Sequence, residues 1–348
     1  MPGRLLLWSW QWAPRRVSPI HRSPAFSVRP RTGLDTLPSS RRFLSSAHTP
    51  PENAAVAFQS ADRLSGRTCM ITGGTSGIGF AIAERFLQEG ASSVILVGRS
   101  QKRLQDAAGR LGVLTGALPN SDNNNFGQVA ARAPEDDTQN LNKIRLLLGD
   151  VSDAGSWMRE LEKEMSSVDV LVNAAGVSIS NILPRSDPEH ISQILRTNLE
   201  GAMLTSRALM RASIRSRARN RTDAAGEGKP SSKCIINVSS LLALKGGTGA
   251  VPYAASKAGL LGMTRSLAVE AAASLKDIVI RSNAIVPGYI ETPMIADFTP
   301  GETGRLKDLI PLHRFGDPRE VADAAVFLAQ NEYANNCVLN LDGGLSAV

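Results

Sequence analysis

The sequence predicts an α/β domain in which a parallel sheet of about seven strands carries helices on both faces. Short apolar runs, typical of buried strands, alternate with segments of helical apolar spacing along most of the 348 residues. A glycine-rich turn joins the first apolar run to the first helical segment. No internal repeat is present, and a hydrophobic content of 42% is enough for a full core. A single doubly wound domain therefore fits the chain best.

The elements follow one another in a regular order. Strands are expected at 68–71, 94–97, 144–148, 168–172, 233–238, 278–285 and 338–341. Helices are expected at 80–89, 100–111, 157–165, 189–213, 253–273 and 318–329. Two polar stretches with little apolar periodicity, 112–142 and 214–233, are interpreted as exposed surface insertions, and 294–315 as a substrate flap.

The basic charge of the chain is confined to its beginning. The formal net charge is +7, and residues 1–50 contain eight arginines and a single acid, Asp35, while the rest of the chain is electrically balanced. This removes the argument for a nucleic-acid partner that a pI near 9.6 would otherwise support. An Arg- and Ser-rich, acid-poor leader is typical of a mitochondrial transit peptide, and a disordered basic tail is the alternative.

We therefore expect a transit peptide over 1–45, a flexible approach over 46–63, the folded domain over 64–348, and a location in the mitochondrial matrix. No apolar stretch approaches the roughly 20 residues that span a bilayer. Cys69, Cys234 and Cys337 are scattered and lack metal-ligand spacing, which indicates a reducing compartment and neither a disulfide framework nor a metal site.

The glycine turn indicates a dinucleotide site. Glycines at such a turn allow a tight bend and a close approach of the backbone to a pyrophosphate, which then faces the amides of the following helix. The turn reads Thr72-Gly73-Gly74-Thr75-Ser76-Gly77-Ile78-Gly79, so its spacing differs from the commoner Gly-x-Gly-x-x-Gly. A Rossmann-type fold is therefore the specific prediction.

The end of the second strand bears on the choice of cofactor. Folds specific for NAD tend to place an acid there for the ribose 2′-hydroxyl, whereas this chain has Gly98 and Arg99. A guanidinium suits a 2′-phosphate, so NADP(H) is favoured, and a solvent-facing arginine at a helix start is the alternative. Asp150, which follows the third strand, either reaches the adenine or caps the next helix.

Three side chains form a candidate catalytic group. Tyr253 and Lys257 are four residues apart in a predicted helix, so they lie on one face, one turn from each other. Ser240 ends the strand before that helix. A phenol has a pKa of about 10, and a neighbouring ammonium would stabilise its anion. The alternative is an unrelated surface tyrosine, surface lysine and strand-end serine.

The ordered set of motifs resembles the short-chain dehydrogenase/reductase family over about residues 64–345. The motifs are Thr72-Gly73-x-x-x-Gly77-Ile78-Gly79, Asn173-Ala174-Ala175-Gly176, Asn198, Ser240, Tyr253-x-x-x-Lys257 and Pro287-Gly288. Within the family, the chain looks most like the 3-oxoacyl-[acyl-carrier-protein] reductases and their mitochondrial carbonyl-reductase relatives. The cues are the segments 286–292, 310–316 and 339–344.

The resemblance implies a catalytic tetrad. Tyr253 would protonate the substrate carbonyl oxygen, and Lys257 would lower the pKa of the phenol and hydrogen-bond the nicotinamide ribose. Ser240 would hold the carbonyl oxygen, and Asn198 would keep a water in the proton relay. The cofactor NADP(H) would be bound by Thr72, Gly73, Thr75, Ser76, Gly77, Ile78, Gly79, Arg99, Asp150, Val151, Asn173, Ala174, Gly176, Tyr253, Lys257, Pro287, Gly288, Ile290 and Thr292.

The resemblance also implies a substrate and an oligomeric state, and the chain differs from its relatives at two places. It implies reduction of a 3-oxoacyl group on acyl carrier protein in fatty-acid synthesis by a homotetramer. The alternatives are a carbonyl reductase for quinones, steroids or small ketones, and a non-catalytic cofactor-binding subunit of a hetero-oligomer. NADP-preferring relatives often have a basic residue at the position of Ser76, so Arg99 carries most of the cofactor inference. The segment 331–337 is shorter than in bacterial relatives, at an end that packs across their subunit interface.

Overall fold

The computed structural model describes residues 62–115, 143–153, 155–223, 232–275 and 278–348. The expectations for the leader 1–45 and for most of the segments 46–63 and 112–142 lie outside these residues. Within the described ranges, no helix combines the length and the apolar character needed to cross a membrane.

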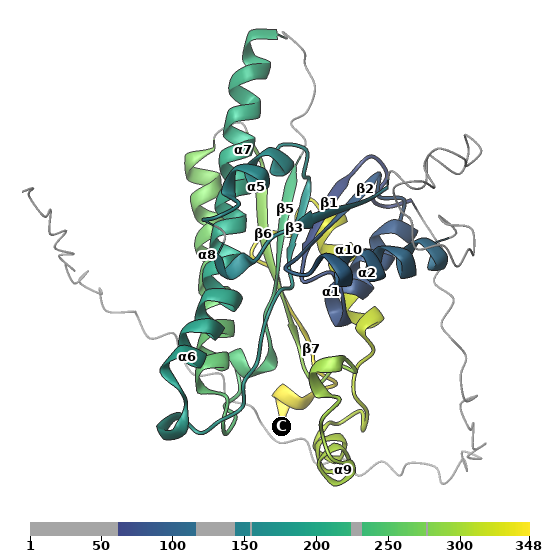
Figure 1. Cartoon of the computed structure of the whole chain (residues 1–348), viewed down its shortest axis with the longest axis vertical. Helices are drawn as coiled ribbons and strands as arrows, with labels where there is room; N and C mark the ends of the chain where they lie inside the picture. The colour runs from purple at the N-terminus through teal and green to yellow at the C-terminus, as the bar shows by residue number, and fades with distance from the viewer. Residues whose placement is uncertain (1–61, 116–142, 154, 224–231, 276–277) are drawn as a thin grey trace, which may run out of the picture. The chain divides into compact units, whose positions relative to one another are not determined.

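A seven-stranded sheet forms the centre of the domain, and every strand pair in it is parallel (Figure 1). The strand order is β3-β2-β1-β4-β5-β6-β7. The strands are β1 (Thr68–Thr72), β2 (Ser93–Gly98), β3 (Ile144–Leu148), β4 (Val170–Asn173), β5 (Lys233–Val238), β6 (Ile280–Pro287) and β7 (Val338–Leu341). The predicted fold class is confirmed.

Helices cover both faces of the sheet, as expected for parallel strands joined by crossovers (Figure 1). One face carries α1 (Gly77–Gln88), α2 (Gln101–Leu114) and α10 (Pro318–Gln330). The other carries α5 (Met158–Met165), α7 (Gly201–Asp223) and α8 (Val251–Ser274). Two further helices, α6 (Pro188–Leu195) and α9 (Pro300–Leu309), lie near the end of the sheet where the strands finish (Figure 1).

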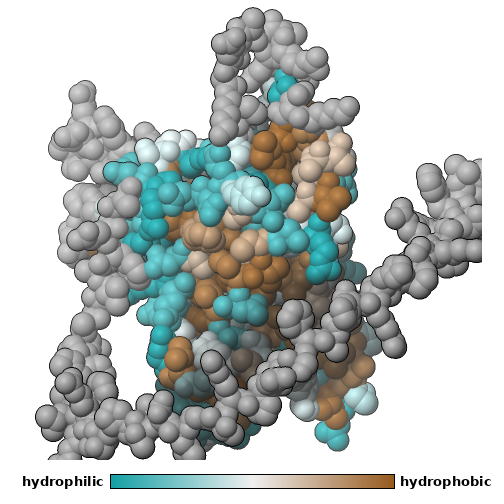
Figure 2. Space-filling model, turned by 180° about the vertical axis from the view of Figure 1, so that it is seen from behind, coloured by the Kyte–Doolittle hydropathy of each residue, from teal (hydrophilic) through white to brown (hydrophobic). Residues whose placement is uncertain are grey.

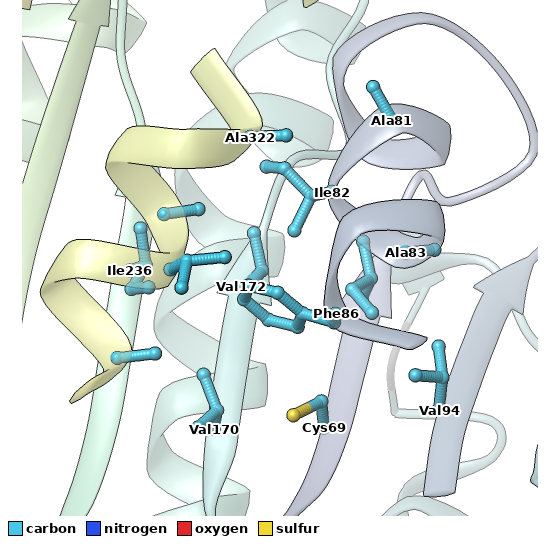
Figure 3. Packing of buried hydrophobic residues seen from close by; sticks show 14 of the residues in the cluster. Cys69, Ala81, Ile82, Ala83, Phe86, Val94, Val170, Val172, Ile236 and Ala322 are labelled. Atoms are coloured by element: carbon cyan, nitrogen blue, oxygen red, sulfur yellow. The ribbon is translucent and has the colours of Figure 1, made fainter. Parts of the chain in front are cut away.

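The core consists of two apolar layers, one on each face of the sheet, because successive strand residues point to opposite sides. Cys69 belongs to the layer under α1 and α10, and Met70 belongs to the other layer. Figure 3 shows the first layer, where Phe86 of α1 lies close to Val172 of β4. Both residues are completely buried.

The largest differences from the expected boundaries concern two helices. α2 continues to Leu114, so the first three residues of the expected insertion 112–142 are helical. The helix expected over 189–213 is divided into α6, a single turn of π-helix (η3, Arg196–Glu200) and α7, and α7 continues to Asp223. The first part of the expected insertion 214–233 is therefore helical. The stretch 214–223 contains no glycine or proline and is rich in arginine, a good helix former, so nothing in it stops propagation. Residues 224–231 lie outside the described residues.

The topology predicts a ligand-binding crevice at one end of the sheet. The chain crosses from β3, at one edge, to β4, on the other side of β1, so the strand order reverses between β1 and β4. In open α/β sheets, ligands bind at the carboxyl ends of the strands on either side of such a reversal. The segments that follow β1, β4, β5 and β6 all start at this edge, and they contain most of the predicted site residues.

Candidate active site

The glycine turn lies between β1 and α1 and is shaped as the sequence predicts. Gly73 and Gly77 have φ of +70° and +56°, values that glycine adopts readily. A Cβ atom on Gly79 would lie 2.5 Å from the carbonyl oxygen of Gly73, so the start of α1 packs directly on the turn. Ser76 occupies the N-cap position of α1, but its side chain makes no capping hydrogen bond. The Ser76 side chain therefore does not compete with an anion for the amides of this first turn.

Two other loops close around the glycine turn. A Cβ atom on Gly73 would lie 2.7 Å from the Cα atom of Ala175, in the loop after β4. A Cβ atom on Gly77 would lie 3.3 Å from Cγ2 of Thr292, in the loop after β6. The structure thus brings together three segments that were assigned to the cofactor from separate motifs.

The end of β2 carries two guanidinium groups. Arg99 is 60% exposed, and its Nη1 atom lies 4.0 Å from Oδ2 of Asp150. Asp150 also accepts hydrogen bonds from the backbone amide and the hydroxyl of Ser152, so it caps the following 3-10 turn. Arg103, on the first turn of α2, donates a hydrogen bond to Oγ of Ser76 at 3.4 Å. The sequence reasoning did not consider Arg103, although a second arginine one turn after Arg99 was a visible signal.

Several residues assigned to the cofactor have buried side chains that bind other parts of the protein. The hydroxyl of Thr72 accepts from the amide of Ala175 at 3.2 Å. Val151 and Ile290 belong to the apolar core. These residues shape the crevice, and contacts from them to a cofactor would come through the backbone.

Asn198 lies in the π-turn and is almost completely buried. Its Oδ1 atom accepts from the amide of Val177 at 2.8 Å, and its Nδ2 atom donates to the carbonyl of Val177 at 3.0 Å. This pair of hydrogen bonds fixes the loop after β4. Single π-turns inside α-helices are frequent at functional sites, so the unusual backbone coincides with the predicted site residue.

Ser256 connects Asn198 to the helix of the tyrosine. Nδ2 of Asn198 donates to Oγ of Ser256 at 3.0 Å, and this hydroxyl donates to the carbonyl of Tyr253 at 2.7 Å. Ser256 is completely buried. The sequence reasoning missed it, although a serine directly before Lys257 was a usable signal.

Lys257 is buried, and its ammonium lies beside the loop after β4. Its Nζ atom donates to the carbonyl of Val238 at 2.9 Å and lies 5.6 Å from the ring centroid of Tyr253. A Cβ atom on Gly176 would lie 3.3 Å from this Nζ and 3.4 Å from Oδ1 of Asn198, so a larger residue here would crowd both groups. Burial lowers the pKa of Lys257 to about 8.

Tyr253 and Ser240 face each other beside this lysine. Burial raises the pKa of the Tyr253 phenol above its usual value, and a hydrogen bond with Ser240 acts in the opposite direction. Oγ of Ser240 also accepts from the amide of Leu242 at 3.2 Å, which starts a short 3-10 turn. The phenol is therefore protonated at neutral pH in the protein without cofactor and stands beside a second hydroxyl.

A buried hydrogen-bond network holds the strands and helices that carry the site residues. Nδ2 of Asn173 donates to Oδ1 of Asn237 at 2.9 Å, and Nδ2 of Asn237 donates to Oγ1 of Thr264 at 2.9 Å. Thr205 donates to Oδ1 of Asn173 at 2.7 Å. These bonds join β4, β5, α7 and α8 at a fixed spacing. Asn237 was not predicted as a site residue, although an amide in an otherwise apolar strand needs buried partners.

The residues present fit a dinucleotide with an additional phosphate. Ser76 makes no capping hydrogen bond at the start of α1, and Arg99 and Arg103 lie just after the second strand. After β5 and at the start of α8, Ser240 and Tyr253 bring two hydroxyl groups within hydrogen-bond reach of each other. Among the described residues, no cluster of side chains suited to a metal ion is found.

Comparison with known proteins agrees with this site. Residues 117–346 match the family described as Enoyl-(Acyl carrier protein) reductase, and residues 67–119 match the short chain dehydrogenase family. The chain is 36% identical to the 3-oxoacyl-[acyl-carrier-protein] reductase of Bos taurus, covering 80% of this chain and 98% of the relative. It is 33% identical to carbonyl reductase family member 4 of Danio rerio, with the same coverage.

A solved structure shows the same fold. It is described as a NAD(P)-dependent gluconate 5-dehydrogenase of Beutenbergia cavernae with bound NADP, and the two chains are 27% identical with a TM-score of 0.65. The alignment covers 82% of this chain and 98% of the other. The sequence motifs, the sheet topology, the crevice and these matches lead to one conclusion: the chain belongs to the short-chain dehydrogenase/reductase family.

Proposed function

We propose that this protein uses NADPH to reduce a 3-oxoacyl thioester on acyl carrier protein to the 3-hydroxyacyl form. The observation that carries the proposal is the convergence of Ser240, Tyr253, Lys257 and Asn198 at the carboxyl edge of the sheet. The names of the bovine and zebrafish relatives and the NADP bound to the solved neighbour support the substrate class and the cofactor.

Each side chain has a role that its surroundings support. NADPH, when bound, supplies the hydride. Tyr253 is a neutral phenol at pH 7, since burial raises its pKa further above neutrality, and it donates a proton to the carbonyl oxygen as negative charge develops there. Ser240 donates a hydrogen bond to the same oxygen. Lys257 stabilises the phenolate that remains and binds the ribose hydroxyls, while Asn198 holds the loop and a water of the proton relay.

Apolar side chains around the crevice support a substrate with an acyl chain. The loop after β4, the turn after Ser240, the start of α8 and the loop after β6 all border the site. Each carries exposed apolar residues, namely Ile182, Leu183, Leu244, Val251 and Met294. The loop after β4 touches the residues just before α8, since the amide of Asn181 donates to the carbonyl of Gly249 at 3.0 Å.

The test is the oxidation of NADPH by the full-length protein with 3-oxoacyl thioesters of several chain lengths. Tyr253→Phe should lower kcat by about 10²–10⁴-fold because the proton donor is lost. Tyr333→Phe is the matched control, because Tyr333 is 98% exposed and should leave turnover unchanged. Absence of turnover with every 3-oxoacyl chain would refute the substrate, and full activity of Tyr253→Phe would refute the mechanism.

A second candidate function is suggested by the zebrafish relative. A carbonyl reductase for quinones, steroids or small ketones would use the same tetrad. Turnover of such ketones without turnover of 3-oxoacyl thioesters would establish it. A third possibility, a non-catalytic cofactor-binding subunit, predicts NADPH binding with no turnover of any ketone in the absence of a partner.

We also propose that the protein is a homotetramer. Large apolar side chains remain exposed on α7, α8, α10 and β7, among them Met203, Val269, Phe327 and Val338. On the face drawn in Figure 2, hydrophobic residues lie exposed in the middle, among hydrophilic ones. Such exposed apolar surface is typical of protein–protein contacts. The mass by light scattering tests the proposal: a monomer contradicts it, and a tetramer only with a second chain supports a hetero-oligomer.

The mitochondrial matrix is the proposed location, supported by the composition of residues 1–45. Fusion of these residues to a fluorescent protein should direct it to mitochondria. The same fusion with all its arginines replaced by glutamine should remain outside. A wild-type fusion that stays outside mitochondria would refute the assignment.

A further inference from the structure

The glycine turn carries a serine at the position before its second glycine. Ser76 has no charge, and the chain therefore places no cation on the turn itself. Its hydroxyl does not cap α1, although serine at an N-cap position usually does. The hydroxyl instead accepts a hydrogen bond from Nη2 of Arg103 at 3.4 Å.

Arg103 is held at this place by its helix. α2 starts at Gln101, directly after β2, and Oγ of Ser100 accepts from the amide of Arg103 at 3.4 Å. The first turn of α2 is thereby fixed beside the glycine turn, and the exposed guanidinium of Arg103 extends across to it. Arg99 directly follows Gly98, and a Cβ atom on Gly98 would lie 3.3 Å from Cγ2 of Thr75 in the glycine turn.

The two arginines differ in their acidic neighbours. Arg99 forms an ion pair with Asp150 at 4.0 Å. In the part of the chain that the structure describes, Arg103 forms no ion pair with an acid, and its side chain donates to Ser76. A guanidinium without an acidic partner keeps its full attraction for an anion. Paired donors from two guanidiniums match the oxygen atoms of a phosphate group.

We propose that Arg103 binds the 2′-phosphate of the cofactor together with Arg99, and so replaces the cation that the glycine turn lacks. The second helix of the domain, rather than the turn, then supplies half of the selectivity for NADP(H) over NAD(H). This inference rests on the NADP(H) cofactor of the proposed function. It concerns binding alone and is independent of the ketone that is reduced.

The experiment measures calorimetric binding of 2′,5′-ADP and 5′-AMP to the full-length protein, because these probes differ only in the 2′-phosphate. Arg103→Gln should weaken the binding of 2′,5′-ADP about tenfold, the lower end for a lost hydrogen bond to a charged group at an exposed site. The binding of 5′-AMP should stay within about twofold. Lys102→Gln is the matched control, since Lys102 is an exposed cation on the same turn but about 100° away around the helix.

A double variant sharpens the result. Arg99→Gln combined with Arg103→Gln should bind 2′,5′-ADP no more tightly than 5′-AMP. Equal weakening by Arg103→Gln and Lys102→Gln would overturn the inference and leave the proposed reductase standing, because only a general effect of charge would remain. Equal binding of the two probes by the unmodified protein would overturn it as well, and would also contradict NADP(H) as the cofactor.

Discussion

Lys257→Met should make the protein without cofactor more stable at neutral pH while it abolishes turnover. Burial lowers the pKa of this lysine from 10.5 to about 8, so keeping the ammonium buried costs about 3 kcal/mol at about 1.4 kcal/mol per pKa unit. The hydrogen bond from Nζ to the carbonyl of Val238 offsets about 1 kcal/mol of this cost. Methionine has a similar shape and no charge, so the expected gain in the free energy of unfolding is about 2 kcal/mol.

The stability advantage of Lys257→Met over the unmodified protein should decrease as the pH rises. The folded-state pKa of Lys257 lies below its unfolded value, so between about pH 8 and 10.5 the unfolded chain binds more protons than the folded one. The cost is fully present below pH 8 and disappears as the pH rises toward 10.5. The stability of the unmodified protein should therefore approach that of Lys257→Met across this window.

Urea unfolding at a fixed protein concentration, at half-unit steps from pH 7 to 10.5, measures the difference. Lys102→Met is the matched control, because Lys102 is exposed and its replacement should shift stability by less than about 0.5 kcal/mol at every pH. The reasoning would be refuted if Lys257→Met were less stable at pH 7, or if its advantage were unchanged at pH 10.5.

Two further predictions concern the buried hydrogen-bond network and the glycine turn. Asn237→Ala should lower the free energy of unfolding by about 2–4 kcal/mol in urea, because Asn173 and Thr264 lose a buried partner; a loss below 1 kcal/mol would contradict the network. Gly79→Ala should greatly weaken NADPH binding by fluorescence titration, because the new carbon would lie 2.5 Å from a backbone oxygen of the glycine turn. Gly301→Ala, with open space around it, is the control, and equal binding by both variants would contradict the expectation.

Features with a local pattern could be predicted from the sequence. The strand and helix sequence follows from apolar periodicity, and the parallel sheet follows from their alternation. The spacing of Tyr253 and Lys257 places them on one helical face without any knowledge of the fold. The predicted end of the helix at residue 213 was wrong, since α7 continues to Asp223. A polar, arginine-rich stretch can form either an exposed helix or a loop, and composition alone does not separate the two.

Ser240, Tyr253 and Lys257 were found from the sequence alone as a hydroxyl, a phenol and an ammonium near one another in the chain. The residue types determine which groups can donate a proton, because acid–base chemistry is a property of the side chains themselves. Only the tertiary structure decided what surrounds them: the burial that lowers the pKa of Lys257, the link through Ser256, and the position of Arg103 beside Ser76. These contacts join different strands and helices, and their distances depend on how the layers pack, which no local pattern specifies.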